Sequence, residues 1–158
     1  MNQSYRGSYG QRSASANTST APRETKKHSL LTEDNYVEMA EAAIDTLIKN
    51  NLDRRGNPKI VSTSKIRNLL AMTADIYNEV SNHLDEKLSQ EQRGRIAYLN
   101  VRFIYDSGRD KDVKALVDEA DILAHIRDIK DSRRQFILFS RYMEALVAFR
   151  KYKVDRDE

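Results

Sequence analysis

The sequence contains no cysteine, only two prolines and no long run of hydrophobic residues. Without cysteine, the chain has no disulfide bond, no thiol nucleophile and no zinc site built from cysteine ligands. No apolar run approaches the roughly eighteen residues that span a membrane, and the N-terminus has no apolar core of the signal-peptide kind. We therefore expect a cytoplasmic protein without a membrane partner.

The net charge of +3 is unevenly divided along the chain. Residues 1–29 contain five basic residues and one acid, which leaves 22 basic and 23 acidic residues for positions 30–158. The larger part is therefore close to neutral, and a basic surface on it requires that the charges be segregated. The overall charge is thus weak evidence for a nucleic-acid partner.

The first thirty residues differ in composition from the rest. They are rich in Ser, Thr, Asn, Gln and Gly and show no apolar periodicity, so they bury too little to offset the entropy of ordering. We predict a disordered basic and polar tail over residues 1–30 and a single helical-bundle domain over residues 31–158. Tyr5 and Tyr9 beside Arg6 are compatible with loose RNA contact, but the low information content favours a solvated leader without a role.

Apolar residues at helical spacing predict two helices in the first half of the domain. The first covers about residues 34–50 and ends before the turn signal "RRGNP" at 54–58. The second follows the hydroxyl N-cap candidates Ser62 to Ser64. Its apolar stripe consists of Ile66, Leu69, Leu70, Thr73, Ile76, Tyr77 and Val80.

The sequence of the second half of the domain predicts a third helix, followed by one or two short helices and a last long helix. Ser89 and Gln92 form a capping box for the third helix, and Gly108 is a suitable C′ residue to end it. Asp110 caps a short fourth helix, and residues 122–129 extend that helix or form another. A last long helix begins near residue 131 or 132 and runs to about 152. The fold class predicted is all-α, a compact bundle of about five to six helices joined by short turns, with a disordered N-terminal tail.

No group of residues indicates catalysis. The three histidines, His28, His83 and His125, lack a partner at metal-ligand spacing, so we interpret them as ordinary surface or satisfied polar residues. The acids Asp106, Asp110 and Asp112 lack a calcium-loop pattern, and helix capping explains Asp110 better. The sequence has no glycine-rich phosphate loop and no nucleophile elbow. We expect a protein that is not an enzyme and has no metal or cofactor.

The third predicted helix carries a seam of alternating arginines and tyrosines: Arg95, Tyr98, Arg102, Tyr105 and Arg109. On a regular helix these residues fall within about 80° of one another. Ile96, Leu99 and Phe103 predict one packed face, and Ala97, Val101 and Ile104 predict a second. Arginine offers phosphate a bidentate fork, and tyrosine offers a base or ribose an apolar face. In the alternative interpretation, the arginines pair with acids of neighbouring helices and the tyrosines fill the edge of the core.

Other basic residues lie in the first turns of predicted helices, where a positive charge destabilises the helix. Lys65 and Arg67 lie in the first turns of the second helix, where cations oppose the helix dipole. An anionic partner would offset that cost. Arg133 and Arg134 are likewise cations at the start of the last helix, where they oppose its dipole. Arg134 and Arg141, seven residues apart, lie on the same stripe of that helix. These positions suggest one basic surface.

Three stretches, "STSKIRNLL" (62–70), "YLNVRFIYDSGRD" (98–110) and "FILFSRYMEALVAFRKY" (136–152), together resemble one known family. It is the small subunit of type III-A CRISPR–Cas effector complexes, the Csm type. The likeness covers about residues 36–152, and the order and spacing of the three stretches carry it. The tail lies outside it.

The resemblance implies a non-catalytic helical protein that stacks in several copies as the inner filament of an antiviral complex. The copies would line the groove in which target RNA pairs with guide RNA and would bind its sugar–phosphate backbone. The partners implied are guide RNA, target RNA, the backbone subunit, the large signature subunit and further copies of the chain. The family's basic positions correspond here to Lys65, Arg67, Arg102, Arg109, Arg133, Arg134 and Arg141, with Tyr98 and Tyr105 as weaker candidates.

A second class of function stays open. In it, the chain is a helical protein–protein adaptor whose arginines meet acidic protein partners. Arg102 in particular sits mid-helix, where it can bond a neighbouring helix.

Overall fold

The structure is a computed structural model and describes residues 26–154. Within this range the regular secondary structure is helical, as predicted, and no strand is present. The six helices described are α1 (Tyr36–Asn50), α2 (Thr63–Ser81), α3 (Gln90–Arg109), α4 (Lys111–Glu119), α5 (Ile122–Ile129) and α6 (Arg133–Val154). None of them is both long enough and apolar enough to cross a bilayer.

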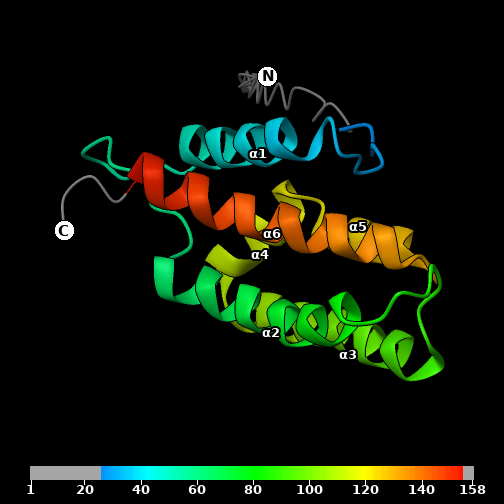
Figure 1. Cartoon of the computed structure of the whole chain (residues 1–158). Coiled ribbons are helices and arrows are strands. Elements are labelled where there is room, and N and C mark those ends of the chain that lie inside the picture. The colour runs from blue at the N-terminus through cyan, green and yellow to red at the C-terminus, as the bar shows by residue number, and fades with distance from the viewer. Residues whose placement is uncertain (1–25, 155–158) are drawn as a thin grey trace, which may run out of the picture.

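Helix α6 is the central element of the bundle. It packs against α1 on one side and α2 on the other, while α3 packs on α2, α4 and α5 (Figure 1). Arg133 at the start of α6 contacts the end of α2, and Arg150 near the end of α6 contacts Val61 just before α2 begins. The two helices therefore run antiparallel. Phe136, Phe139 and Met143 on α6 are fully buried in this arrangement.

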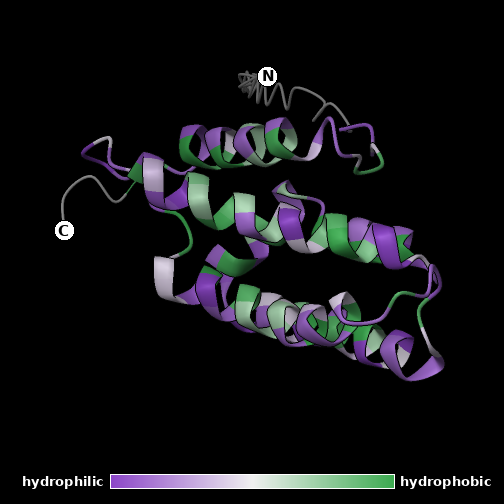
Figure 2. Ribbon diagram, viewed as in Figure 1, coloured by the Kyte–Doolittle hydropathy of each residue, from purple (hydrophilic) through white to green (hydrophobic). Residues whose placement is uncertain are grey.

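Hydrophobic periodicity predicted the buried face of α2 well. In α2, five of the seven residues of the predicted stripe are buried, and Leu70 and Tyr77 are partly buried against the core. Figure 2 shows the same pattern, with hydrophobic and hydrophilic residues side by side on each long helix. The burial of one apolar stripe per helix, at about 25 cal/mol per Å² of apolar area, is what holds the helices together.

The predicted N-caps are confirmed. The Ser62 hydroxyl accepts from the backbone N–H of Lys65, and Ser89 and Gln92 form a capping box in which each side chain accepts from the other's backbone N–H. These bonds satisfy N–H groups that the first turn of a helix leaves without partners. The chain after α1 turns at Gly56 with a φ of 83°, as the predicted turn signal requires.

The predicted end of the third helix is wrong. Gly108 is not its C′ residue, because α3 continues through Arg109 and Gly108 does not adopt a left-handed φ. Asp110 ends α3 with extended backbone (φ −137°), and its carboxylate accepts from the N–H groups of Asp112 and Val113 in α4. A side-chain cap thus makes the turn without glycine.

The open alternative for residues 122–129 is resolved as a separate helix. Asp121 has a left-handed φ of 52°, which interrupts the chain between α4 and α5. Helix α6 then begins at Arg133, where the Ser132 hydroxyl accepts from the N–H of Gln135.

The predicted tail falls partly inside the described residues. Residues 1–25 lie outside them, as do residues 155–158. Residues 26–30 have no regular secondary structure, yet Lys26 contacts Glu119 at 2.5 Å and His28 contacts Asp121 and Asp128. The end of the predicted tail is therefore held against α4 and α5.

Candidate nucleic-acid interface

The arginine–tyrosine seam lies along one exposed edge of α3. Tyr98 and Tyr105 are 63% and 53% exposed, so neither fills the edge of the core. Capping at Ser89 and burial of Ile96, Leu99 and Phe103 fix the rotation of the helix. The edge that carries the seam lies beside α2, because Arg95 pairs with Glu79 of that helix.

Tyr105 is held between two arginines. The guanidinium carbon of Arg102 lies 5.8 Å from the centre of the Tyr105 ring, and that of Arg109 lies 5.3 Å from it. Each such cation–π contact at an exposed site contributes about 0.5–1 kcal/mol. Among the residues that the structure describes, neither arginine has a carboxylate partner. Their charge is therefore available to an anion.

An open groove of about 640 Å³ runs between α2 and α3 beside the seam. Its walls combine apolar side chains with two seam arginines: Met72 and Ile76 from α2, and Arg95, Tyr98 and Arg102 from α3. Asp75 and Glu91 also line it. Apolar and cationic groups together suit a ribose or base beside a phosphate.

Lys65 lies at the other end of the seam and is already paired. Its ammonium contacts the carboxylate of Asp110, and the two residues line a small pocket with Arg109 and Asp106. The pair raises the pKa of Lys65, and the hydrogen bond from Lys65 lowers the pKa of the Asp110 carboxyl. Asp110 thus offsets the unfavourable position of Lys65 at the helix N-terminus.

Arg67 and Arg141 are exposed on α2 and α6. Within residues 26–154 the structure gives neither side chain an ion pair or hydrogen bond. Both are free to meet an anion.

Arg133 and Arg134 have local partners instead. Arg133 donates to the carbonyl oxygens of Val80 and Ser81 at 3.0 and 3.2 Å, and Arg134 pairs with Glu33 at 3.1 Å. Lys65 and Val80 are fifteen residues apart on α2, which corresponds to about 22 Å along the helix. The structure therefore separates the Lys65–Arg109 end of the candidate interface from the Arg133 end.

The prediction of a second packed face on α3 is wrong for the isolated chain. Ala97 is exposed, and Val101 and Ile104 are 54% and 51% exposed. The helices α2, α4 and α5 cover only the side centred on Leu99 and Phe103. The seam therefore borders an exposed apolar strip.

Sequence reasoning missed one further group of residues. His28, His125 and Asp128 come together although His28 lies far from the other two in the chain. The only signal available was His125 and Asp128 at a spacing of three on one helix. That spacing alone does not identify a site.

Comparisons with known proteins match the part of the chain that contains the candidate interface. The Csm2 Type III-A family model matches residues 47–156, which takes in α2 to α6 and every basic candidate named above. The chain belongs to the Csm2 family. It is similar to the CRISPR system Cms protein Csm2 of Streptococcus thermophilus, with 39% identity over 81% of this chain and 98% of that protein. Against the protein of the same name from Mycobacterium tuberculosis (strain H37Rv), identity is 35% over 80% of this chain and 97% of the relative.

A third relative, the Csm2 protein of Enterococcus italicus, is 36% identical over 63% of this chain and 76% of its own length. These comparisons confirm the resemblance to the Csm small subunit. As a Csm2 protein, the chain is a Csm subunit of a type III-A CRISPR system. His28 lies before the matched residues 47–156.

Proposed function

We propose that the chain is a non-catalytic cytoplasmic subunit that stacks in several copies and binds the sugar–phosphate backbone of the target RNA–guide RNA duplex. The observation that carries the proposal is the Arg102–Tyr105–Arg109 group on the outer edge of α3, in which two cations flank an exposed aromatic ring and have no carboxylate partner among residues 26–154. Guide and target read each other by base pairing, so the protein needs only to recognise backbone charge and shape.

The candidate residues contribute unequally to this proposal. Arg102, Arg109, Tyr98 and Tyr105 supply the seam, and Lys65 adds a cation beside it that is shared with Asp110. Arg67 and Arg141 supply further free charge on α2 and α6. Arg133 and Arg134 rank lowest, because each is engaged by α2 or by Glu33.

A double substitution in the assembled complex tests the proposal. Arg102→Gln with Arg109→Gln removes both cations while keeping polar side chains on α3. We expect the complex to assemble with its normal subunit content and target RNA affinity to fall at least tenfold, with a shallower dependence on salt. The measurement is target RNA binding by purified complex across a salt series, with subunit stoichiometry from native mass spectrometry.

The matched control is Arg54→Gln with Arg55→Gln, which removes the same charge from the exposed loop after α1. This variant should bind target RNA like the unaltered complex. Equal affinity in the seam variant and the control would overturn the RNA assignment.

The exposed apolar strip on α3 favours a second candidate function, that of a protein–protein adaptor. Val101 and Ile104 are 54% and 51% exposed and lie next to each other on α3, and adjoining exposed apolar side chains can mark a protein–protein contact. In this case the Arg102 and Arg109 double variant would drop out of the complex, while complexes that retained the chain would bind RNA normally. The same experiment therefore separates the two functions.

A further inference from the structure

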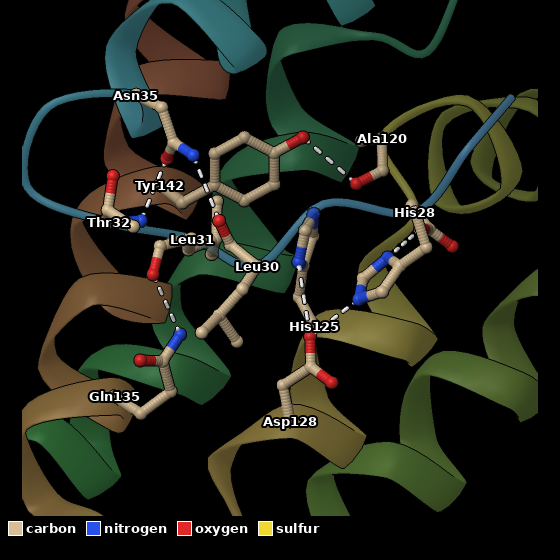
Figure 3. A network of polar contacts seen from close by, with 11 residues as sticks. His28, Leu30, Leu31, Thr32, Asn35, Ala120, His125, Asp128, Gln135 and Tyr142 are labelled. Atoms are coloured by element: carbon tan, nitrogen blue, oxygen red, sulfur yellow. Dashed lines mark hydrogen bonds and ion pairs between the residues drawn. The ribbon is translucent and has the colours of Figure 1, made fainter.

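His28, His125 and Asp128 meet where the 26–30 segment lies against α5 (Figure 3). The ligand atoms of His28, His125 and Asp128 all lie within 4.8 Å of one another. Asp121, at the junction of α4 and α5, contacts His28 from the other side of the ring. None of these residues belongs to the seam of the proposed RNA interface.

His125 is the unusual member of the group. Its side chain is only 1% exposed, and within the described residues neither ring nitrogen has a hydrogen-bond partner. A buried polar group left without a partner destabilises the folded state. The Nδ1 atom faces the Asp128 carboxylate at 4.0 Å, too far for a hydrogen bond. Burial lowers the pKa of His125 to about 4, so its imidazole is neutral and keeps a lone pair.

His28 is oriented by carboxylates on both sides. Its Nε2 lies 2.6 Å from Oδ2 of Asp128, and its Nδ1 contacts the carboxylate of Asp121. A metal-bound histidine usually donates its second ring N–H to a carboxylate, which fixes the tautomer and the ring orientation. Asp121 already holds that place at Nδ1, which leaves Nε2 directed at Asp128 and His125.

We propose that His28, His125 and Asp128 bind one divalent transition-metal ion of the Zn²⁺ class. Asp121 orients His28 by accepting a hydrogen bond from the Nδ1–H of His28. Two imidazoles and a carboxylate are a common ligand set for this ion. Tetrahedral bonds of about 2.0–2.1 Å separate neighbouring ligand atoms by roughly 3.3 Å. The His28–Asp128 distance of 2.6 Å and the His125–Asp128 distance of 4.0 Å lie on either side of that value.

Side-chain movements of about an ångström therefore build the site. The carboxylates of Asp128 and Asp121 raise the pKa of His28, so an ion bound at Nε2 would displace the proton there, and the two negative charges would then balance the 2+ ion. A pocket of about 390 Å³ opens beside His28, Asp121 and Asp128 and leaves room for water as the fourth ligand. The ion would join the segment before α1 to α5 and give His125 the partner it lacks.

Metal titration of the full chain, prepared without a polyhistidine tag and treated with a chelator, tests the site. We expect one Zn²⁺ per chain by calorimetry, a visible Co²⁺ spectrum of the tetrahedral type, and a higher Tm with Zn²⁺ than without. His28→Gln and Asp128→Asn should each lower Zn²⁺ affinity at least tenfold, and Asp121→Asn roughly 10–100-fold. These side chains are at least partly exposed, so the variants should fold even if a His125 variant does not.

The matched control is His83→Gln, because His83 is an exposed histidine outside the cluster. Its Zn²⁺ affinity should equal that of the unaltered chain. Absence of stoichiometric binding by the unaltered chain would overturn the proposal, as would unchanged affinity in both His28→Gln and Asp128→Asn. Neither result bears on RNA binding, which the seam variants test separately.

Discussion

Lys65 shows how a single residue's role depends on a partner that is distant in sequence. A cation in the first turn of α2 opposes the helix dipole, which led us to expect an anionic partner. The structure supplies one within the chain, since Asp110 from the α3–α4 junction contacts the ammonium group. Asp110 at the same time caps α4. One carboxylate thus links the starts of two helices.

Lys65→Ala should raise the pKa of Asp110 toward its ordinary value of 3.8, because the hydrogen bond from Lys65 is the largest cause of its depression. A carboxyl with a depressed folded pKa contributes stability that is present above pH 3.8 and is lost as the pH falls through the folded pKa. Acid unfolding of the variant should therefore begin at a higher pH. The measurement is an NMR titration of the Asp110 side chain.

Lys114→Ala is the control for this prediction, since Lys114 pairs with Asp118 on the solvent side of α4. It should leave the Asp110 titration unchanged. An unchanged Asp110 pKa in Lys65→Ala would show that the pair contributes nothing in solution.

At the scale of helices, two adjacent arginines on α6 illustrate different uses of the same residue type. Arg133 donates to the last carbonyls of α2, where a cation is favoured by the dipole and otherwise unpaired acceptors are satisfied. Arg134 reaches Glu33 across the surface and is 75% exposed. The sequence "RR" does not distinguish the two arginines, but of the two only Arg133 joins two helices.

Arg133→Met should therefore destabilise the fold by roughly 1.5–3 kcal/mol, the usual range for hydrogen bonds from a charged group. Arg134→Met should cost less than about 1 kcal/mol, because exposed ion pairs contribute little. Urea denaturation followed by circular dichroism measures both. Equal effects of the two substitutions would contradict the assigned role of Arg133.

For helix α3 the sequence pattern predicted only part of the packing correctly. Its capping box and buried face follow directly from residue spacing, and both are confirmed. Its second apolar face was predicted to be packed because Ala97, Val101 and Ile104 recur at helical spacing. Spacing identifies a face, but it does not say whether a neighbour within the same chain covers that face.

At the scale of the whole molecule, charge is the relevant property. Beyond residue 29, basic and acidic residues nearly balance. Several basic groups are further engaged by acids or carbonyls within the bundle. A copy with little excess charge can lie beside identical copies without strong repulsion.

A lone chain should accordingly bind RNA weakly, with a Kd of about 10⁻⁶–10⁻⁴ M at physiological salt, since it makes few phosphate contacts. Tight binding would arise only when several copies act together. Fluorescence anisotropy with a labelled single-stranded RNA across a salt series measures this. The Arg102 and Arg109 double variant should reduce the salt slope, whereas the Arg54 and Arg55 control should change it little. Nanomolar binding by the lone chain would contradict the prediction.

The sequence by itself determined the all-α fold, the helix starts at Ser62 and Ser89, and the alignment of alternating arginines and tyrosines along one edge of α3. These features depend on contacts within one turn of helix or on the 3.6-residue period, both of which are local. The separate α5 was left open, since the left-handed Asp121 that divides it from α4 is not a glycine.

Only the tertiary structure decided which cations have partners. Lys65 with Asp110, Arg133 with the end of α2, and His28 with α5 each join residues at least 45 positions apart. No local period encodes such pairs, because they depend on how the helices pack. Packing therefore distinguishes Arg102 and Arg109, which have no carboxylate partner among the described residues, from arginines such as Arg133 that join two helices.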